Sequence, residues 1–351
     1  PILRDRATKA KASTKMSDRA IRIAINGFGR IGRSILRMLH GAGHGVQAGT
    51  FEVVLINDIA PLESCAYLFA YDSIFGPFPG TVGHEERCLN VDRVRYPFHA
   101  EADIRALDLS GVDVLLECTG AAGNRAVAER GLEAGAKAVL ISGPSEAADI
   151  TIVLGANEAE IGAHKIISNA SCTTNALAPL LRLLDEGWGV ESGHMTTVHC
   201  YTGSQPTIDK PRGDLVRSRA AALSMVPTTT SAARLIDDVL PNLSGRIEAR
   251  AVRVPTASVS AIDLALQVAR PATVADVNAA LSEAADHSPL FGYITDPLVS
   301  TDLRGRPESI IMSGRETSVS VGGLLRVFGW YDNEWGFSSR MLDMAALMAR
   351  R

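Results

Sequence analysis

One cysteine near the middle of the chain has the sequence context of a nucleophile. Cys172 lies in the pentapeptide SCTTN, residues 171–175, directly before the apolar run 176–184, which predicts a helix that begins at the cysteine. Unpaired N–H groups and the positive end of the helix dipole favour a thiolate there, so we expect the pKa of Cys172 to be lowered. A Ser/Thr helix cap that happens to contain a cysteine explains the pentapeptide alone equally well.

A histidine at a strand end is the candidate acid/base partner. His199 follows the segment 195–198, which predicts a strand. If the fold brings Cys172 and His199 together, the pair supplies a thiolate and a proton acceptor for covalent catalysis. Taken alone, a strand-end histidine is also typical of a structural residue.

Several groups suited to binding anions follow the cysteine. Arginine offers a planar fork of donors to phosphate oxygens, and hydroxyl groups complete their hydrogen bonds. A solvated charged loop is the alternative interpretation of residues 206–219. The candidate anion ligands are Thr202, Arg217, Arg219, the hydroxyl cluster 228–231 and Arg253.

A glycine pattern near the start of the chain indicates a dinucleotide site. Gly27, Gly29 and Gly32 form G-x-G-x-x-G between a predicted strand at 20–25 and a predicted helix at 34–39, where a pyrophosphate can approach the backbone. A second predicted strand at 51–57 is followed by Asp58. Asp58 lies further beyond Gly32 than the usual ~20 residues, and we interpret residues 41–49 as a loop insertion that accounts for the extra length. Asp58 would accept hydrogen bonds from the ribose hydroxyls and favour NAD over NADP; a solvated strand-end carboxylate is the alternative.

The elements that position these residues fall into two patterns. Apolar strands at 112–118, 138–142 and 150–155 alternate with helical stretches such as 125–134, which predicts a doubly wound parallel sheet. Thr119, Gly120 and Ser142 follow the carboxyl ends of these strands, where such sheets bind ligands. The later strands at 194–201, 247–254, 258–268 and 318–330 predict a largely antiparallel sheet in an α+β domain, and the helical run 341–349 is expected to pack back on the first domain.

Composition excludes several classes of protein. The 351 residues carry a formal net charge of -4, so no basic surface for nucleic acid is expected. Five cysteines include no C-x-x-C pair and no zinc-binding spacing, which favours a reduced, cytoplasmic setting and no metal. No apolar stretch reaches the ~18 residues of a membrane span, and the basic residues 1–15 are typical of a leader or disordered arm.

Five segments together resemble the phosphorylating glyceraldehyde-3-phosphate dehydrogenases. They occur in order along nearly the whole chain, from Ile21 to the C-terminus. The segments are NGFGRIGR at 26–33, SNASCTTN at 168–175, TVHCYT at 197–202, RVPT at 253–256 and YDNEWG at 331–336.

The resemblance implies a reaction and assigns roles to the candidate residues. It implies a homotetrameric glycolytic enzyme that oxidises and phosphorylates glyceraldehyde 3-phosphate to 1,3-bisphosphoglycerate with NAD. Cys172 would form a thioester and His199 would act as the base. Thr202 and Arg253 match the substrate-phosphate site, and Asn333 matches the residue that orients the nicotinamide. Ser171, Thr173, Arg217, Thr230 and Ser231 match the site of the attacking phosphate, while Phe28, Arg30 and Ile31 complete the glycine loop around the cofactor.

The implied fold is a Rossmann doubly wound sheet plus an α+β catalytic domain. We expect a leader at 1–16, an NAD-binding domain at 17–171, a catalytic and oligomerisation domain at 172–333, and a C-terminal helix within 334–351 that packs on the NAD-binding domain. Residues 200–225 match a loop that reaches the cofactor site of a neighbouring subunit.

Four positions depart from the family pattern. Ser231 replaces a usual glycine in the phosphate loop, Ala176 replaces a frequent second cysteine, and Phe337 replaces a common tyrosine beside the nicotinamide. Lys210, before Pro211, would weaken the discrimination against NADP.

Two other activities are alternatives to this interpretation. One is an erythrose-4-phosphate dehydrogenase, which tends to lack the Tyr-Thr pair after the histidine. The other is a catalytically idle redox sensor that uses only Cys172.

Overall fold

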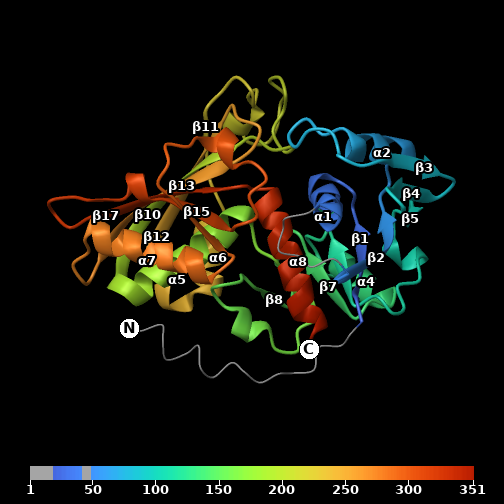
Figure 1. Cartoon of the computed structure of the whole chain (residues 1–351), viewed down its shortest axis with the longest axis horizontal. Coiled ribbons are helices and arrows are strands. Elements are labelled where there is room, and N and C mark those ends of the chain that lie inside the picture. Colours follow the sequence, from blue (N-terminus) through green and yellow to red (C-terminus); the bar gives the residue numbers. More distant parts are fainter. Residues whose placement is uncertain (1–18, 42–48) are drawn as a thin grey trace.

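Two β-sheets organise the chain in this computed structural model, which describes residues 19–41 and 49–351. A nine-stranded sheet is built from the first half and an eight-stranded sheet from the second. Helix α8 (Trp335–Ala349) runs between them in Figure 1. The expected leader at 1–16 and most of the expected loop insertion at 41–49 lie outside the described residues.

The first sheet has the predicted doubly wound core. Its order is β3-β4-β5-β2-β1-β6-β7-β9-β8, and the strands from β5 to β8 pair in parallel. The antiparallel extension β3-β4-β5 was not predicted, because its short, half-exposed strands lack a continuous apolar run. The strands are β1 (Ile21–Asn26), β2 (Phe51–Asn57), β3 (Val82–Glu85), β4 (Cys88–Val91), β5 (Val94–His99), β6 (Val114–Glu117), β7 (Ala138–Ile141), β8 (Ile150–Thr151) and β9 (Ile166–Ser168).

Two predicted elements of the first half differ in the structure. The expected strand at 150–155 stops after two residues, because the side chain of Asn157 accepts a hydrogen bond from the Val153 N–H at 2.9 Å and turns the chain. The expected helix at 125–134 consists of two short helices that meet at Glu129. The helices here are α1 (Arg30–His40), α2 (Leu62–Ala70), α3 (Arg125–Ala128) and α4 (Arg130–Glu133), with 3-10 turns η1 (Ile104–Ala106) and η2 (Glu158–Ile161).

The second sheet is largely antiparallel, as predicted. Its order is β11-β12-β10-β13-β17-β15-β14, with β16 paired to β17; only the β10/β12 and β14/β15 pairs are parallel among its described pairings. The predicted strand at 318–330 is wrong as one element, because a turn at Gly323 (φ 81°) divides it. The strands are β10 (Val190–Cys200), β11 (Val226–Thr228), β12 (Ile247–Val254), β13 (Ser260–Val268), β14 (Phe291–Ile294), β15 (Ile310–Ser313), β16 (Ser318–Val319) and β17 (Leu325–Tyr331).

Helices of the second half cover this sheet and lead into the site. Helix α5 begins at Cys172, as predicted, and its buried face lies in the core of the second sheet. Helix α7 was missed, although the hydroxyl of Thr273 caps it by accepting a hydrogen bond from the Asp276 N–H. The elements are α5 (Cys172–Trp188), α6 (Ala232–Val239) and α7 (Val274–His287), with 3-10 turns η3 (Val216–Ser218), η4 (Pro241–Leu243), η5 (Ser300–Leu303) and η6 (Gly314–Glu316).

The C-terminal helix α8 belongs to the core of the first sheet. It begins at Trp335, earlier than the predicted 341, and its buried side chains pack with those of α1 and β6. Cys172 contacts both this core and that of the second sheet. The candidate nucleophile therefore lies where the two halves of the molecule meet.

Candidate active site

A strained turn delivers Cys172 to the start of α5. Strand β9 ends at Ser168, and Ala170 then adopts a left-handed conformation (φ 54°) that is unfavourable for a residue with a side chain. The Ser171 hydroxyl caps the helix by accepting a hydrogen bond from the Thr174 N–H at 3.1 Å. The strained turn at Ala170 and the Ser171 cap together fix the backbone that carries Cys172 into the helix.

The fold brings the two predicted reactive residues together. The Cys172 Sγ lies 3.6 Å from the Nε2 of His199, which is 4% exposed near the end of β10. The ring of Tyr331 meets the histidine ring edge-on, with centroids 6.0 Å apart. A thiol and an imidazole in contact form the pair that covalent catalysis requires.

Burial changes the electrostatics expected from the sequence. It raises the pKa of the Cys172 thiol, although the positive charge of Arg253 and hydrogen bonding to Thr173 lower it. The prediction of a lowered pKa is therefore wrong for this arrangement, because desolvation outweighs the helix terminus. Burial, followed by the charge of Arg253, lowers the pKa of His199 to about 4. Burial therefore disfavours the charged form of each of these two groups.

Sequence reasoning missed a buried hydroxyl network beneath the cysteine. The Tyr331 hydroxyl lies 2.8 Å from the hydroxyls of both Thr173 and Thr197. These three residues come from β17, α5 and β10, so the network joins two strands of the second sheet, which β13 separates, to the helix that carries Cys172. The signal available in sequence was the tyrosine at the end of an apolar strand, but its partners depend on the sheet order.

Arg253 faces the histidine across a parallel strand pair. The β10/β12 register places His199 opposite Arg253. The Arg253 Nη1 lies 2.7 Å from His199 Nδ1 and donates to the Cys200 carbonyl at 2.9 Å. The predicted phosphate ligand is therefore in direct contact with the predicted base.

The remaining anion candidates lie on exposed loops near β11. Arg217 donates to the Thr228 hydroxyl at 2.6 Å and the Thr229 hydroxyl at 3.1 Å, while the Thr202 hydroxyl lies 2.9 Å from that of Ser204. The Thr230 hydroxyl accepts a hydrogen bond from the Ala232 N–H at the start of α6. The fold thus brings Arg217 to the hydroxyl cluster, whereas Arg219 points elsewhere and donates to Asp209.

The glycine loop has the shape that a dinucleotide needs. A Cβ at Gly27 (φ 95°) would lie 2.6 Å from the backbone of Thr119, and one at Gly32 would lie 2.2 Å from the Gly27 carbonyl oxygen. A Cβ at Gly29 would meet none of the described residues within 4 Å. The first and third glycines therefore allow close packing, and the second leaves the start of α1 open to a pyrophosphate.

Polar residues at three neighbouring strand ends support this loop. Asp58 accepts hydrogen bonds from the N–H groups of Phe28 at 2.6 Å and Ala60 at 2.8 Å. The buried Glu117 accepts from Asn26 at 2.6 Å and bonds the hydroxyl and N–H of Thr119. Sequence reasoning missed Asn26 and Glu117, although each occupies the last position of its strand.

Other predicted cofactor residues lie at the same edge of the sheet or beside Cys200. Gly120 (φ 73°) follows Thr119, and the Ser142 N–H donates to the Glu117 carbonyl at 3.0 Å. Ile31 lies in the first turn of α1, and Arg30 forms ion pairs with Asp72 and Glu334. The buried Asn333 accepts a hydrogen bond from the Cys200 thiol at 3.1 Å.

Comparison with known proteins matches both halves of the chain. Residues 21–125 match the model of the glyceraldehyde 3-phosphate dehydrogenase NAD binding domain, and residues 171–333 match that of its C-terminal domain. The chain belongs to the glyceraldehyde-3-phosphate dehydrogenase family.

Curated relatives named glyceraldehyde-3-phosphate dehydrogenase are similar over nearly their full lengths. The protein of Pseudomonas aeruginosa is 48% identical over 337 residues, covering 94% of this chain and 98% of the relative. The protein of Cereibacter sphaeroides is 46% identical over 334 residues, covering 94% and 99%. That of Xanthobacter flavus is 44% identical over 341 residues, also covering 94% and 99%.

The departures from the glyceraldehyde-3-phosphate dehydrogenase pattern fit the fold without strain. Ser231 adopts a right-handed conformation (φ −75°, ψ −2°) that any residue tolerates, so its side chain does not distort the start of α6. Ala176 is fully buried in α5, and Phe337 is buried in the first core at the start of α8. Lys210 is exposed, and its N–H donates to the Ser218 carbonyl.

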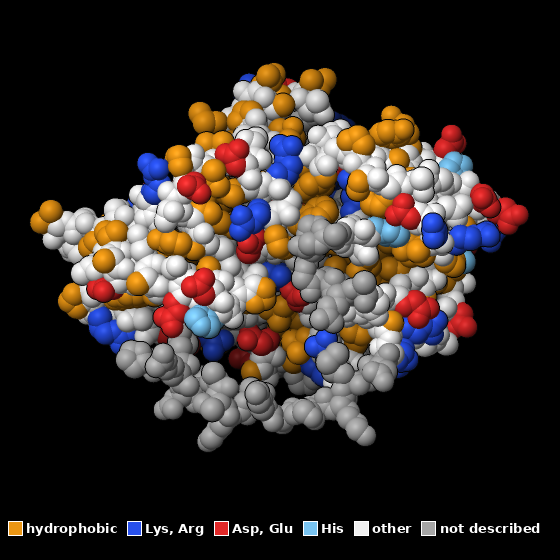
Figure 2. Space-filling view, in the orientation of Figure 1, with side chains coloured by type: hydrophobic (Ala, Val, Ile, Leu, Met, Phe, Trp, Pro, Cys, Tyr) orange, Lys and Arg blue, Asp and Glu red, His pale blue; other side chains and the backbone are white. Residues whose placement is uncertain are grey.

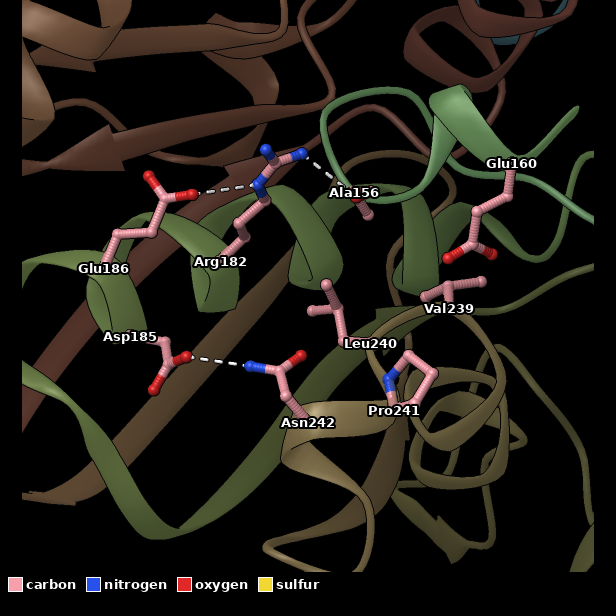
Figure 3. A pocket seen from close by; sticks show the side chains of 9 residues that line it. All are labelled: Ala156, Glu160, Arg182, Asp185, Glu186, Val239, Leu240, Pro241 and Asn242. Atoms are coloured by element: carbon pink, nitrogen blue, oxygen red, sulfur yellow. Dashed lines mark hydrogen bonds and ion pairs between the residues drawn. The ribbon is translucent and has the colours of Figure 1, made fainter. Parts of the chain in front are cut away.

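A separate surface pocket of about 230 Å³ lies away from these residues, between the C-terminal half of α5 and η4 (Figure 3). Its polar side chains largely bond to one another: Arg182 donates to Glu186 and to the Ala156 carbonyl, and Asn242 donates to Asp185.

Among the described residues no group of three side chains that could hold a metal ion lies together. No helix of the described residues is long and apolar enough to cross a membrane.

Proposed function

We propose that Cys172 and His199 carry out the NAD-dependent oxidative phosphorylation of glyceraldehyde 3-phosphate to 1,3-bisphosphoglycerate. The chain is an NAD-dependent oxidoreductase of the glyceraldehyde-3-phosphate dehydrogenase family. The observation that carries the residue assignment is the 3.6 Å contact between the Cys172 sulfur and His199 Nε2. A histidine in contact with a cysteine at the junction of the two halves supports the roles of proton acceptor and nucleophile.

In the proposed reaction His199 moves one proton several times. Its Nε2 takes the thiol proton of Cys172, and the resulting thiolate attacks the aldehyde carbon. The new hydroxyl receives that proton and returns it to Nε2 when hydride leaves the same carbon, which leaves a thioester on Cys172. Inorganic phosphate then attacks the thioester carbon, and the thiolate departs.

Two sets of side chains are proposed to hold the two phosphate groups. Thr202 and Arg253 would bind the phosphate of the substrate. Ser171, Thr173, Arg217, Thr230 and Ser231 would bind the attacking phosphate. The contact of Arg217 with Thr228 and Thr229 supports the second set, because it places a guanidinium beside the start of α6.

The glycine loop and its supports are proposed to hold NAD, which supplies the hydride acceptor when bound. Phe28, Arg30, Ile31, Thr119, Gly120 and Ser142 would surround the dinucleotide, and Asn333 would orient the nicotinamide. Asp58 would accept from the ribose hydroxyls, since its carboxylate lies at the end of β2 beside the loop.

A cytoplasmic homotetramer is the proposed setting. Figure 2 shows hydrophobic side chains gathered at the top of the molecule, over the loops beside β11. Four apolar side chains in this region are each 74–85% exposed, which supports a surface covered by another subunit: Ile208, Leu215, Leu223 and Met225.

We also propose that the chain divides into an NAD-binding domain at 17–171 and a catalytic domain at 172–333, and that residues 334–351 pack back on the NAD-binding domain.

The function is tested by NADH formation from glyceraldehyde 3-phosphate with and without inorganic phosphate or arsenate. We expect a stoichiometric burst without the anion and sustained turnover with it, because a thioester must be released. Repeating the assay with NADP and with erythrose 4-phosphate measures both preferences through kcat/KM. A higher value for erythrose 4-phosphate would reassign the substrate, and cofactor binding without a burst would favour the redox-sensor alternative.

A further inference from the structure

The thiol of Cys200 makes a hydrogen bond that the proposed reaction does not use. Cys200 is the last residue of β10 and is fully buried, and its Sγ donates to Asn333 Oδ1 at 3.1 Å. Asn333 is the residue proposed above to orient the nicotinamide. The contact therefore joins a side chain without an assigned role to one that would touch the cofactor.

The Cys200 thiol keeps its proton and is held in place. Burial raises its pKa to about 12, although hydrogen bonding to Ser260 lowers it, so the S–H donor is present at ordinary pH. The Cys200 N–H donates to the Ser260 hydroxyl at 3.1 Å, and its carbonyl accepts from Arg253 at 2.9 Å. The backbone that carries the sulfur is thus bonded on both sides of the strand.

The backbone on both sides of Asn333 is also held, so the thiol acts on its side chain. The Asp332 carboxylate accepts from the Trp335 N–H at 2.8 Å. The Glu334 carboxylate accepts from Arg30 Nε at 3.0 Å. The freedom that remains is rotation of the terminal amide, a broad two-fold torsion that exchanges the oxygen and the nitrogen.

The hydrogen bond from Cys200 determines which end of the Asn333 amide faces outward. An S–H that meets the amide oxygen makes a hydrogen bond, whereas an S–H that meets the amide nitrogen opposes two N–H donors. Asn333 Nδ2 has no hydrogen-bond partner among the described residues, yet it is not one of their fully enclosed, unpartnered polar atoms. It therefore keeps accessible surface, and a ligand beside Asn333 meets an N–H donor.

We propose that Cys200 is a positioning residue that holds the Asn333 amide so that its NH₂ group is presented to a carbonyl acceptor on the cofactor. This rests on the proposed function, in which Asn333 orients the nicotinamide. The carboxamide of nicotinamide also has a donor end and an acceptor end, so a fixed donor selects the orientation in which the carboxamide oxygen faces Asn333. Cys200 thereby contributes to cofactor selectivity without touching the cofactor.

The first test measures the binding of two oxidised NAD analogues that differ from NAD at opposite ends of the carboxamide. 3-Acetylpyridine adenine dinucleotide keeps the carbonyl oxygen and lacks the amine. Thionicotinamide adenine dinucleotide keeps the amine and replaces the oxygen by sulfur, a weaker acceptor. Calorimetry gives the ratio of the Kd of the thio analogue to that of the acetyl analogue. We expect Cys200→Ala to lower this ratio about threefold to tenfold, the effect of one hydrogen bond; an unchanged ratio would overturn the proposal.

Two further variants separate donation from packing. Cys200→Ser keeps a donor at this position, so its ratio should lie closer to wild type than to Cys200→Ala. Cys65→Ala removes another buried thiol, in the core of the first sheet, and should leave the ratio unchanged. A serine variant that behaves like Cys200→Ala, or an equal loss in Cys65→Ala, would assign the effect to packing and contradict the proposal.

Asn333→Ala distinguishes this inference from the function on which it rests. It should lower the ratio at least as far as Cys200→Ala does. A ratio that falls in Asn333→Ala but not in Cys200→Ala would contradict the role of Cys200 alone. An unchanged ratio in Asn333→Ala would contradict the role proposed for Asn333, and the present inference with it.

The second test needs no cofactor and no activity. The S–H stretching band of Cys200 is isolated as the infrared difference between wild type and Cys200→Ala, or Cys200→Ser if the alanine variant does not fold. Because an acceptor weakens the S–H bond of a donating thiol, Asn333→Ala should shift this band to higher wavenumber. An unshifted band would show that the thiol does not donate to Asn333 and would overturn the proposal.

Discussion

The buried reactive pair and the exposed loops proposed to bind anions differ in how their polar groups are held. Around Cys172, the buried hydroxyls of Thr173 and Thr197 both bond to that of Tyr331. Near β11, Arg217 is half-exposed and bonds to the hydroxyls of Thr228 and Thr229, with which a phosphate bound as proposed would compete. The reactive pair is thus fixed by packing, whereas the proposed anion recognition would need side chains that exchange partners. The predictions below separate these two parts.

Removing the nucleophile should have the largest effect. Cys172→Ser replaces the thiol by a hydroxyl that is far less ionised, so we expect kcat to fall by at least about 10⁴-fold. NAD binding, measured by fluorescence quenching, and the melting temperature should stay near the wild-type values. Substantial residual turnover would show that the buried centre is not the site of covalent chemistry.

Removing Arg217 from the exposed loop near β11 should affect only the attack of inorganic phosphate. Arg217→Gln is expected to raise the KM for inorganic phosphate about 10- to 100-fold, through loss of hydrogen bonds to a charged group. The NADH burst with glyceraldehyde 3-phosphate should be unchanged, since that step precedes phosphate attack. Arg219→Gln, on the same loop but paired with Asp209, is the matched control. An equal loss of burst rate would mean that the loop also organises the reactive pair.

Acid should destabilise the buried centre through His199. Its pKa is about 4 in the folded protein and ~6.5 when unfolded, so the unfolded state binds more protons between these values. The stability from the neutral ring is fully present above pH 6.5 and is lost as the pH falls toward 4. Urea denaturation should show that wild type loses about 2 kcal/mol more than His199→Asn between pH 7 and pH 4.5. Equal losses would place the histidine in a more solvated setting.

The smallest effect is expected from the hydroxyl network. Tyr331→Phe removes the hydroxyl that joins Thr173 to Thr197, and we expect the free energy of unfolding to fall by about 1–2 kcal/mol. The turnover number should stay within about threefold of wild type, because no proton passes through this hydroxyl in the proposed reaction. A larger loss of turnover than of stability would give the tyrosine a part in the chemistry.

Features set by local sequence were predicted well. The start of α5 at Cys172, strand β2 at Phe51–Asn57 and strand β12 at Ile247–Val254 all match, because caps and runs of β-branched residues act within a few positions. The fold class was predicted because βα alternation and the later antiparallel runs are also local patterns. The contact between His199 and Cys172 was a hypothesis based on their residue types, and the structure shows the two side chains 3.6 Å apart.

Features that depend on how strands are ordered were not predictable. Asn26 bonds to Glu117 only because β1 and β6 are neighbours in the first sheet. The partners of Tyr331 depend on the order of β10, β13 and β17 and on where α5 packs. The pKa direction of Cys172 failed for the same reason, since two cores meet over a residue that sequence presents only as a helix start. The contact of Arg253 with His199 follows from a parallel pair that sequence gives no reason to expect.

Helix α8 bears on how the protein is made. Its side chains, including Trp335, Met341 and Met348, fill the core of a sheet whose first strand begins at Ile21. During synthesis the nucleotide-binding half therefore emerges from the ribosome with its core incomplete, and it waits for almost the entire chain to be translated before that face is covered. A chain truncated just before Trp335 would keep every residue assigned to catalysis, yet it would present an open apolar surface to chaperones and proteases.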